Sequence, residues 1–141
     1  MFDNFYYKLI EIKDNIKYRL QRIFRGYADI DIWNFDHRLM ELVARHVRVL
    51  RKTTHGHPTS VQQQEEWNQI LDDIVFAAEM YTSEFSDICL ANTLEEYNFA
   101  RDVYNKVYTD EDDLEFPDEE AWRRAQRGIK YFKQYMFALW D

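Results

Sequence analysis

Glycine and proline are scarce in this chain, with 3 Gly and 2 Pro among 141 residues. Because β-hairpin turns draw heavily on both residues, their scarcity argues against an all-β fold. The single cysteine, Cys89, excludes an internal disulfide and a cysteine-based zinc site. No apolar run is long enough for a membrane span or a secretory leader, since Lys8, Lys13 and Lys17 interrupt the N-terminal hydrophobic residues. We therefore expect a protein of a reducing cytosol.

Apolar and aromatic residues, by contrast, are plentiful. Hydrophobic residues make up 46% of the chain and aromatic residues 17%. Disordered chains carry few aromatic residues, and a chain of this length has the material for about one core. We predict a single domain over residues 1–141.

The charge is unevenly distributed along the chain, whose formal net charge is −8. Residues 1–57 hold eleven basic and seven acidic residues, whereas residues 58–141 hold seven basic and nineteen acidic residues. A net acidic protein is repelled by nucleic acid and by anionic membranes, so we expect neither as a partner. The acidic run Asp110–Glu120 is typical of a solvated loop, or alternatively of a surface that mimics nucleic-acid phosphates.

Apolar residues recur every three or four positions, which predicts helices and not strands. Gly26 is expected to end the first helix, and residues 53–59, with a Gly and a Pro, are expected to form a loop. The helical stripes cover residues 2–24, 33–50, 67–81, 94–108 and 122–140. We therefore predict an all-α protein, a compact bundle of about five helices.

Several residues signal where these helices begin. Asp29 and Asp31 are candidate N-caps of the second helix, and Ser60 with Gln63 has the form of a capping box before the third. Pro117 suits the first position of the last helix.

The first helix and the end of the chain also predict an oligomer. The first helix carries apolar residues on more than one side, and the chain ends in the apolar run Leu139-Trp140 before Asp141. Such surfaces need cover, so we expect the end of the chain to dock, and a homo-oligomer to form through the first or the last helix.

The densest cluster of basic and aromatic residues, 22–38, predicts a binding site for a nucleotide-like ligand. A glycine turn leads there into a helix start, where backbone N–H groups and the helix dipole attract anions. Arginines offer forked donors to phosphate, and aromatic rings stack on bases. In this interpretation Arg22, Arg25 and Arg45 hold phosphates, Tyr27 and Trp33 stack on a base, and Asp36 or His57 binds ribose hydroxyls.

The same residues also have a purely structural interpretation. Asp29 or Asp31 would then cap the helix, Asp36 or Glu41 would pair with nearby arginines, and Trp33 would fill the core.

Signals for metal binding and catalysis are weak. His55 and His57 flank a glycine, but further ligands at a diagnostic spacing are missing. Seven-residue spacing places Glu65, Asp72 and Glu79 on one helix face, as in helical magnesium-dependent nucleotide pyrophosphohydrolases. That chemistry needs a second acidic pair, for which Glu95-Glu96 is a poor candidate. We predict no catalytic residue, no metal and no cofactor.

Four segments of the chain resemble a group of short reading frames from tailed bacteriophages and prophages. These segments are Arg25–Asp36, Gly56-His-Pro58, Glu66–Leu71 and Ala138–Asp141. The resemblance implies a viral accessory protein that acts in the cytoplasm of a bacterial host, and it brings no catalytic motif.

The leading hypothesis is therefore a non-enzymatic anti-defence protein that sequesters a phosphate-bearing, nucleotide-derived immune signal. The alternatives are an acidic decoy for a host defence protein and the helical pyrophosphohydrolase.

Overall fold

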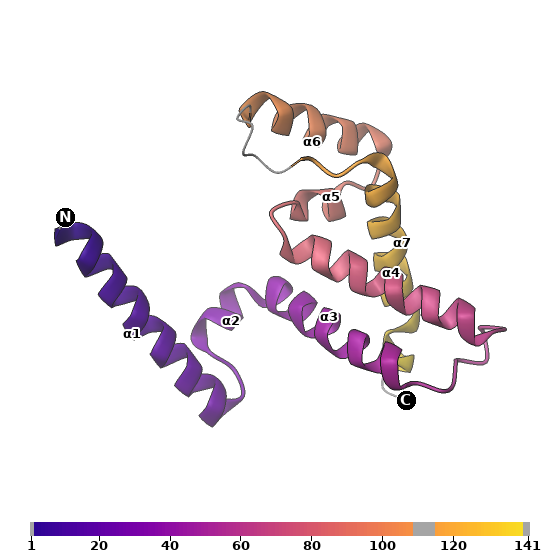
Figure 1. The fold of residues 1–141 in the computed structure, drawn as a ribbon, viewed down its shortest axis with the longest axis horizontal. Helices are drawn as coiled ribbons and strands as arrows, with labels where there is room; N and C mark the ends of the chain where they lie inside the picture. Colours follow the sequence, from indigo (N-terminus) through magenta and orange to yellow (C-terminus); the bar gives the residue numbers. More distant parts are fainter. Residues whose placement is uncertain (1, 109–114, 140–141) are drawn as a thin grey trace. The chain divides into compact units, whose positions relative to one another are not determined.

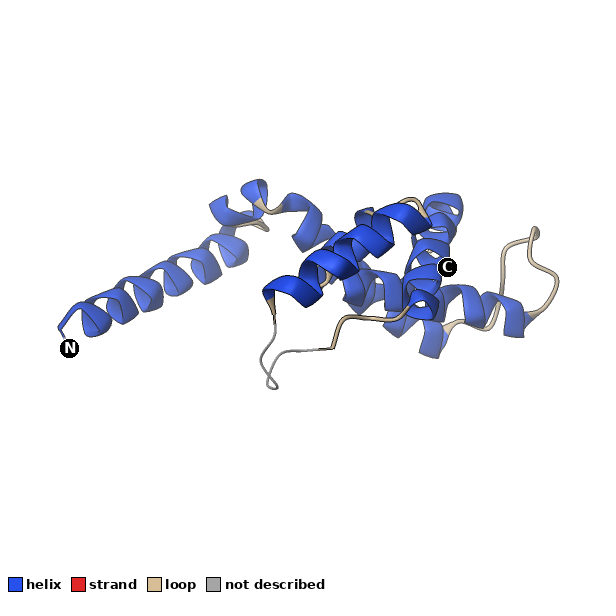
Figure 2. Ribbon diagram, turned by 90° about the horizontal axis from the view of Figure 1, so that it is seen from above, coloured by secondary structure: helices blue, strands red, loops and turns tan. Residues whose placement is uncertain are grey.

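The computed structural model describes residues 2–108 and 115–139, and every regular element in these ranges is a helix (Figures 1 and 2). This confirms the all-α prediction. Five helices have fourteen residues or more, matching the five predicted stripes, and two have five residues. The α-helices are α1 (Phe2–Arg25), α2 (Asp29–Trp33), α3 (Phe35–Thr53), α4 (Gln64–Thr82), α5 (Ser86–Leu90), α6 (Leu94–Val107) and α7 (Glu119–Tyr135), followed by the 3₁₀ turn η1 (Met136–Ala138).

Contacts along the chain gather into two compact units, the first ending at Arg38 and the second beginning at Leu39. Each unit is described by itself below. The single domain over residues 1–141 stays a prediction.

In the first unit, the turn between α1 and α2 is set by Gly26. Its φ of 78° lies in the left-handed region that favours glycine, and its N–H donates to the Arg22 carbonyl at 3.1 Å. The predicted end of the first helix is thus confirmed.

The start of the second predicted helix differs from expectation. Ala28 is the N-cap of α2, and Asp31, three residues later, accepts a hydrogen bond from the Ala28 N–H at 2.8 Å. Neither Asp29 nor Asp31 is the N-cap residue. The helix is also interrupted at Asn34, which separates α2 from α3.

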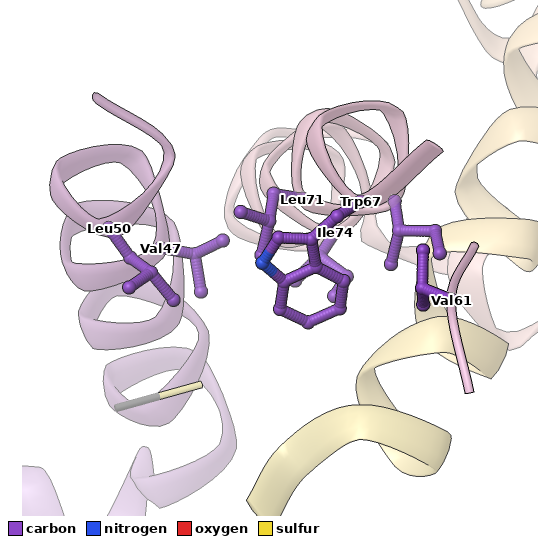
Figure 3. Close-up of a cluster of buried hydrophobic side chains, with 7 residues drawn as sticks. Val47, Leu50, Val61, Trp67, Leu71 and Ile74 are labelled. Carbon is purple, nitrogen blue, oxygen red and sulfur yellow. The ribbon is translucent and has the colours of Figure 1, made fainter. Parts of the chain in front are cut away.

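The second unit has its main core between α3 and α4. Trp67 is 2% exposed and packs edge to face against Tyr135, with ring centroids 5.4 Å apart. Burial of such large side chains contributes about 2 kcal/mol each to stability. The buried cluster is formed by Val47, Leu50, Val61, Trp67, Ile70, Leu71 and Ile74 (Figure 3). The inward stripe predicted for the third helix is confirmed from Trp67 to Ala78, whereas Tyr81 at its end is half-buried.

Helices α4 and α7 cross in close contact (Figure 1). At the crossing Gly128 leaves no room for a side chain, because a Cβ there would lie 2.0 Å from the Asp73 carbonyl oxygen. The Asp73 carboxylate is fully buried and accepts hydrogen bonds from Arg124 Nε at 2.9 Å and Arg127 Nε at 2.7 Å. A glycine contact and two partly exposed ion pairs to the buried Asp73 carboxylate therefore join the two helices.

A second buried cluster lies where α5, α6 and α7 meet. Tyr97 stacks on Trp122 with centroids 5.2 Å apart, and Trp122 Nε1 donates to the Ala91 carbonyl at 2.9 Å. The Tyr97 hydroxyl donates to the Pro117 carbonyl at 2.9 Å. These contacts anchor the start of α7 against α6.

Two predicted helix starts in this unit are wrong. Helix α4 begins at Gln64 with Gln63 as N-cap and without a side-chain cap bond, so Ser60 and Gln63 form no capping box. Helix α7 begins at Glu119, and its N-cap Asp118 accepts from the Ala121 N–H at 2.8 Å. Pro117 therefore precedes the cap instead of occupying the first helical position.

The predicted docking of the chain end is confirmed for Ala138 and Leu139, which pack against the main core. Trp140 and Asp141 lie outside the described residues. The same holds for residues 109–114, which contain the first part of the acidic run Asp110–Glu120.

Candidate functional site

The predicted arginine site begins at the turn between α1 and α2, where both arginines pair with carboxylates. Arg22 binds Asp31 through two bonds, Nε to Oδ2 at 3.0 Å and Nη2 to Oδ1 at 2.6 Å. Arg25 Nη2 lies 2.5 Å from Asp29 Oδ1, and the Arg25 guanidinium lies 4.9 Å from the centre of the Tyr27 ring. Asp29 and Asp31 therefore pair with the two arginines, whereas the structural interpretation had them cap the helix.

These ion pairs shift the acidity of the carboxylates. The hydrogen bonds from Arg22 lower the pKa of Asp31 to about 2, and those from Arg25 lower the pKa of Asp29. Both aspartates are thus anionic at neutral pH and neutralise the guanidinium groups. A phosphate would have to displace a carboxylate from each arginine.

The other predicted ligand-binding residues lie apart from this turn or in the second unit. Trp33 is 85% exposed at the end of α2, so it does not fill the core, and Asp36 is exposed in the first turn of α3. Arg45 and His57 belong to the second unit and are exposed there. Within the first unit, the Arg25 guanidinium lies over the Tyr27 ring, and Arg22 lies one turn earlier on α1.

The acidic face of α4 serves helix packing. Asp72 Oδ1 pairs with Arg51 Nε at 3.0 Å, and Glu79 pairs with Arg48, which fastens α3 to α4. Within residues 2–108 and 115–139, no group of three histidine, cysteine or acidic side chains has the arrangement of a metal site. The His55–His57 pair accordingly gains no further ligand within these ranges.

A hollow of the second unit lies between α5, α6 and the segment before α7. It has a volume of about 850 Å³, within the usual range for ligand pockets. We call it the aromatic hollow. Its lining consists of Glu84, Phe85, Asp87, Ile88, Phe99, Ala100, Val103, Tyr104, Val107, Tyr108 and Phe116.

Interlocking rings form the floor of the aromatic hollow. Tyr104 contacts Phe85 at 5.4 Å and Phe116 at 5.3 Å between ring centroids, and it stacks on Tyr108 at 4.5 Å. Phe116 also contacts the buried Tyr97 at 5.9 Å, which ties the floor to the second core cluster. The floor is thus packed on the core, as in a preformed binding surface.

The rim of the aromatic hollow is exposed and apolar. Along α6, Phe99 is 72% exposed, Val103 44% and Val107 65%. Four-residue spacing places the three side chains in one row on the helix surface. An apolar row in contact with water is typical of an interaction site.

The electrostatic character of the aromatic hollow is acidic. Glu84 and Asp87 are exposed carboxylates in its lining, and none of the described lining residues is basic. Residues 84–120, which include the lining, contain thirteen acidic and two basic residues. The hollow thus offers ring faces and negative charge, a combination that attracts cations.

Sequence reasoning missed this site for two reasons. Residues 94–108 were predicted only as a helix, with no site on it, and the rings at Phe85 and Phe116 lie outside the predicted helices. The signal that could have found it is the row of Phe99, Val103 and Val107 within a strongly acidic segment.

The comparisons with known proteins give no relative for this chain: no family model, curated protein or solved structure matches it significantly. Among the described helices, none is both long and apolar enough to cross a lipid bilayer.

Proposed function

We propose that this protein is a non-enzymatic binding protein that captures a basic segment of a partner protein in the aromatic hollow. The observation that carries the proposal is an exposed row of apolar side chains within the most acidic segment of the chain. This proposal modifies the decoy hypothesis of the sequence analysis, which placed the binding surface on the acidic run Asp110–Glu120, and assigns binding to the aromatic hollow instead.

The two kinds of surface have different roles in this binding. Burial of Phe99, Val103 and Val107 against the partner supplies affinity, at about 25 cal/mol per Å² of apolar surface. Glu84 and Asp87 favour lysine and arginine over acidic side chains and speed the encounter. Arginine side chains of the partner stack on exposed ring faces, as cations do on aromatic residues.

The resemblance to bacteriophage reading frames supports a setting for this activity. We propose that the protein acts in the cytoplasm of an infected bacterium and withholds a basic host defence protein from its target. The acidic charge keeps the protein away from nucleic acid itself.

Capture of a nucleotide signal ranks second. Its support is the proximity of Arg22, Arg25 and Tyr27, and its weakness is that Asp31 and Asp29 already neutralise both guanidinium groups. A homo-oligomer, as predicted from the sequence, is compatible with both functions and does not distinguish them.

Calorimetric titration with a designed peptide tests the proposal. The probe is a short amphipathic helix of leucine, phenylalanine, lysine and arginine, and its twin carries glutamate at every basic position. The basic peptide is expected to bind, with an affinity that falls steeply with salt, and the acidic twin is not.

Two double variants locate the site. Replacement of both rim carboxylates, Glu84→Gln with Asp87→Asn, is expected to weaken binding about tenfold. The matched control, Glu65→Gln with Glu120→Gln, removes the same charge outside the lining and is expected to leave binding unchanged. Equal losses in both variants would assign binding to net charge and overturn the proposed site.

A thermal-shift panel of cyclic nucleotides and ADP-ribose derivatives separates the second candidate. Stabilisation by one of them at high excess, lost on Arg25→Ala, would favour nucleotide capture. Binding of neither the basic peptide nor any nucleotide would remove both functions.

A further inference from the structure

Helix α1 carries a stripe of apolar side chains that is open to solvent. Leu9, Ile12, Ile16 and Leu20 are each about half exposed, and Phe24 is 82% exposed. Their spacing of three and four residues places them on one face over about four turns of helix. Part of this face is a groove in which Ile16, Leu20 and Phe24 lie beside lysines.

The charges around the stripe are sorted by sign. At 100° per residue, Lys17 falls along one edge of the stripe with Lys13 just inside it, and Lys8 and Arg19 fall along the other edge. The acidic residues Glu11 and Asp14 fall on the opposite face. The helix thus presents an apolar surface bordered on both sides by cations, with anions directed away from it.

We propose that α1 binds the surface of an anionic lipid membrane and lies parallel to it. In this position the apolar stripe enters the boundary between headgroups and acyl chains. Lysine and arginine at the edges extend their charged ends to the lipid phosphates while their alkyl stems remain in the apolar layer. The acidic face is turned to water, where it meets no repulsion.

The net charge of −8 led us above to expect no membrane partner, and the local arrangement outweighs it. Charges are screened beyond roughly 8 Å at physiological salt, so the lipid surface interacts mainly with the residues that touch it. Those residues are the four cations of the stripe edges. Helix α1 is too polar to cross the bilayer, which is consistent with a helix lying on its surface.

The same arrangement disfavours a second copy of α1 as the occupant of the stripe. Residues that border an apolar seam meet their counterparts across a helical pair, and pairs form best when those charges are opposite. Here Lys13 and Lys17 on one edge and Lys8 and Arg19 on the other would face cations of the second copy. An anionic surface matches both edges.

Flotation of the full-length chain with lipid vesicles tests the proposal. The chain is expected to float with phosphatidylcholine vesicles that contain about 30 mol% phosphatidylglycerol, and much less with pure phosphatidylcholine. Ile16→Asp is expected to reduce binding at least tenfold, because it places a charge in the centre of the stripe. Asn15→Asp adds the same charge one residue away, beside the edge formed by Lys8 and Arg19, and is expected to weaken binding by no more than the roughly fivefold of one edge charge. Circular dichroism verifies that both variants keep their helix content.

A second pair of variants tests the edges independently of the stripe. Lys13→Gln with Lys17→Gln is expected to weaken binding to the anionic vesicles by about fivefold per lysine. The control, Lys106→Gln with Lys130→Gln, changes net charge equally from exposed positions outside α1 and is expected to have little effect. Equal effects of the two pairs would overturn the proposal.

Two further results would also overturn it. One is failure of the full-length chain to float with either kind of vesicle. The other is a dimer, seen in sedimentation equilibrium, that Ile16→Asp dissociates and that does not bind vesicles, because a second copy would then be the occupant. Neither result bears on binding of the basic peptide to the aromatic hollow.

Discussion

Gly128 should be the least replaceable glycine of the chain. It lies in the middle of α7 at the crossing with α4, where helices pack backbone to backbone. A Cβ added at this position would lie 2.0 Å from the Asp73 carbonyl oxygen and 2.7 Å from the Ala77 Cβ. Neither neighbour can rotate away, since one is backbone and the other has no side-chain torsion. The substitution Gly128→Ala must therefore push the two helices apart.

Two opposing effects set the magnitude of this change. Alanine favours the helix over glycine by about 1 kcal/mol. Overpacking of a rigid contact destabilises by about 1 to 3 kcal/mol or more, and separation of the helices would also loosen the ion pairs of the buried Asp73 with Arg124 and Arg127. We expect the steric effect to dominate, with a net loss of about 2 kcal/mol and a Tm lowered by roughly 5 to 10 °C.

Thermal and urea unfolding followed by circular dichroism measure this loss. Gly56→Ala is the matched control, because a Cβ at that loop position meets no atom within 4 Å. It is expected to change stability by less than about 0.5 kcal/mol. A Gly128→Ala variant as stable as the wild-type protein would refute the close approach of α4 and α7.

Two further predictions concern titratable groups of the second unit. Burial raises the pKa of Asp73, but Arg127 and Arg124 more than offset this and hold the pKa below its usual value. The ionised Asp73 therefore stabilises the fold above about pH 4, and this stabilisation is lost as the pH falls through the lowered pKa. In urea titrations, Asp73→Asn should be less stable than the wild type near neutral pH and should lose less stability on acidification. An equally steep acid response in the variant would contradict the ion-pair network. Burial also raises the pKa of the Cys89 thiol to about 11. A thiol reagent at mildly alkaline pH should therefore label Cys89 only after the protein unfolds. Rapid labelling of the native protein would show instead that α5 opens readily.

The helices were largely predictable from the sequence, because the buried face of a helix requires apolar residues every three or four positions. The stripe from Trp67 to Ile74 predicted a buried face of α4, and the structure buries those residues. The break at Asn34 was missed because apolar residues continue on both sides of it. Helix starts were less predictable, because Gln63 and Ala28 cap their helices without a side-chain signal.

Long-range contacts were beyond sequence reasoning. In a helical stripe, an aspartate predicts an exposed position and a glycine weakens the helix, yet Asp73 is buried and Gly128 lies against its backbone where α4 and α7 cross. Their partners lie about fifty residues apart in the sequence, as for Asp73 and Arg124. The aromatic hollow was hidden for the same reason, since Phe85 and Phe116 meet only in the folded chain.

The pairing of charges in the folded chain explains why the charge pattern of the sequence predicted a phosphate site at residues that pair with carboxylates. Basic residues in the first part of the chain suggested a phosphate site, but Arg22, Arg48 and Arg51 pair with carboxylates. In the second unit, Arg124 and Arg127 are directed to Asp73 instead of the acidic segment around the aromatic hollow. The charges to which we assign partners are instead the carboxylates of the hollow and the cations along α1. A chain with both features would hold a basic partner in its second unit while its first helix rests on an anionic membrane, and each half can be disabled by substitutions that leave the other intact.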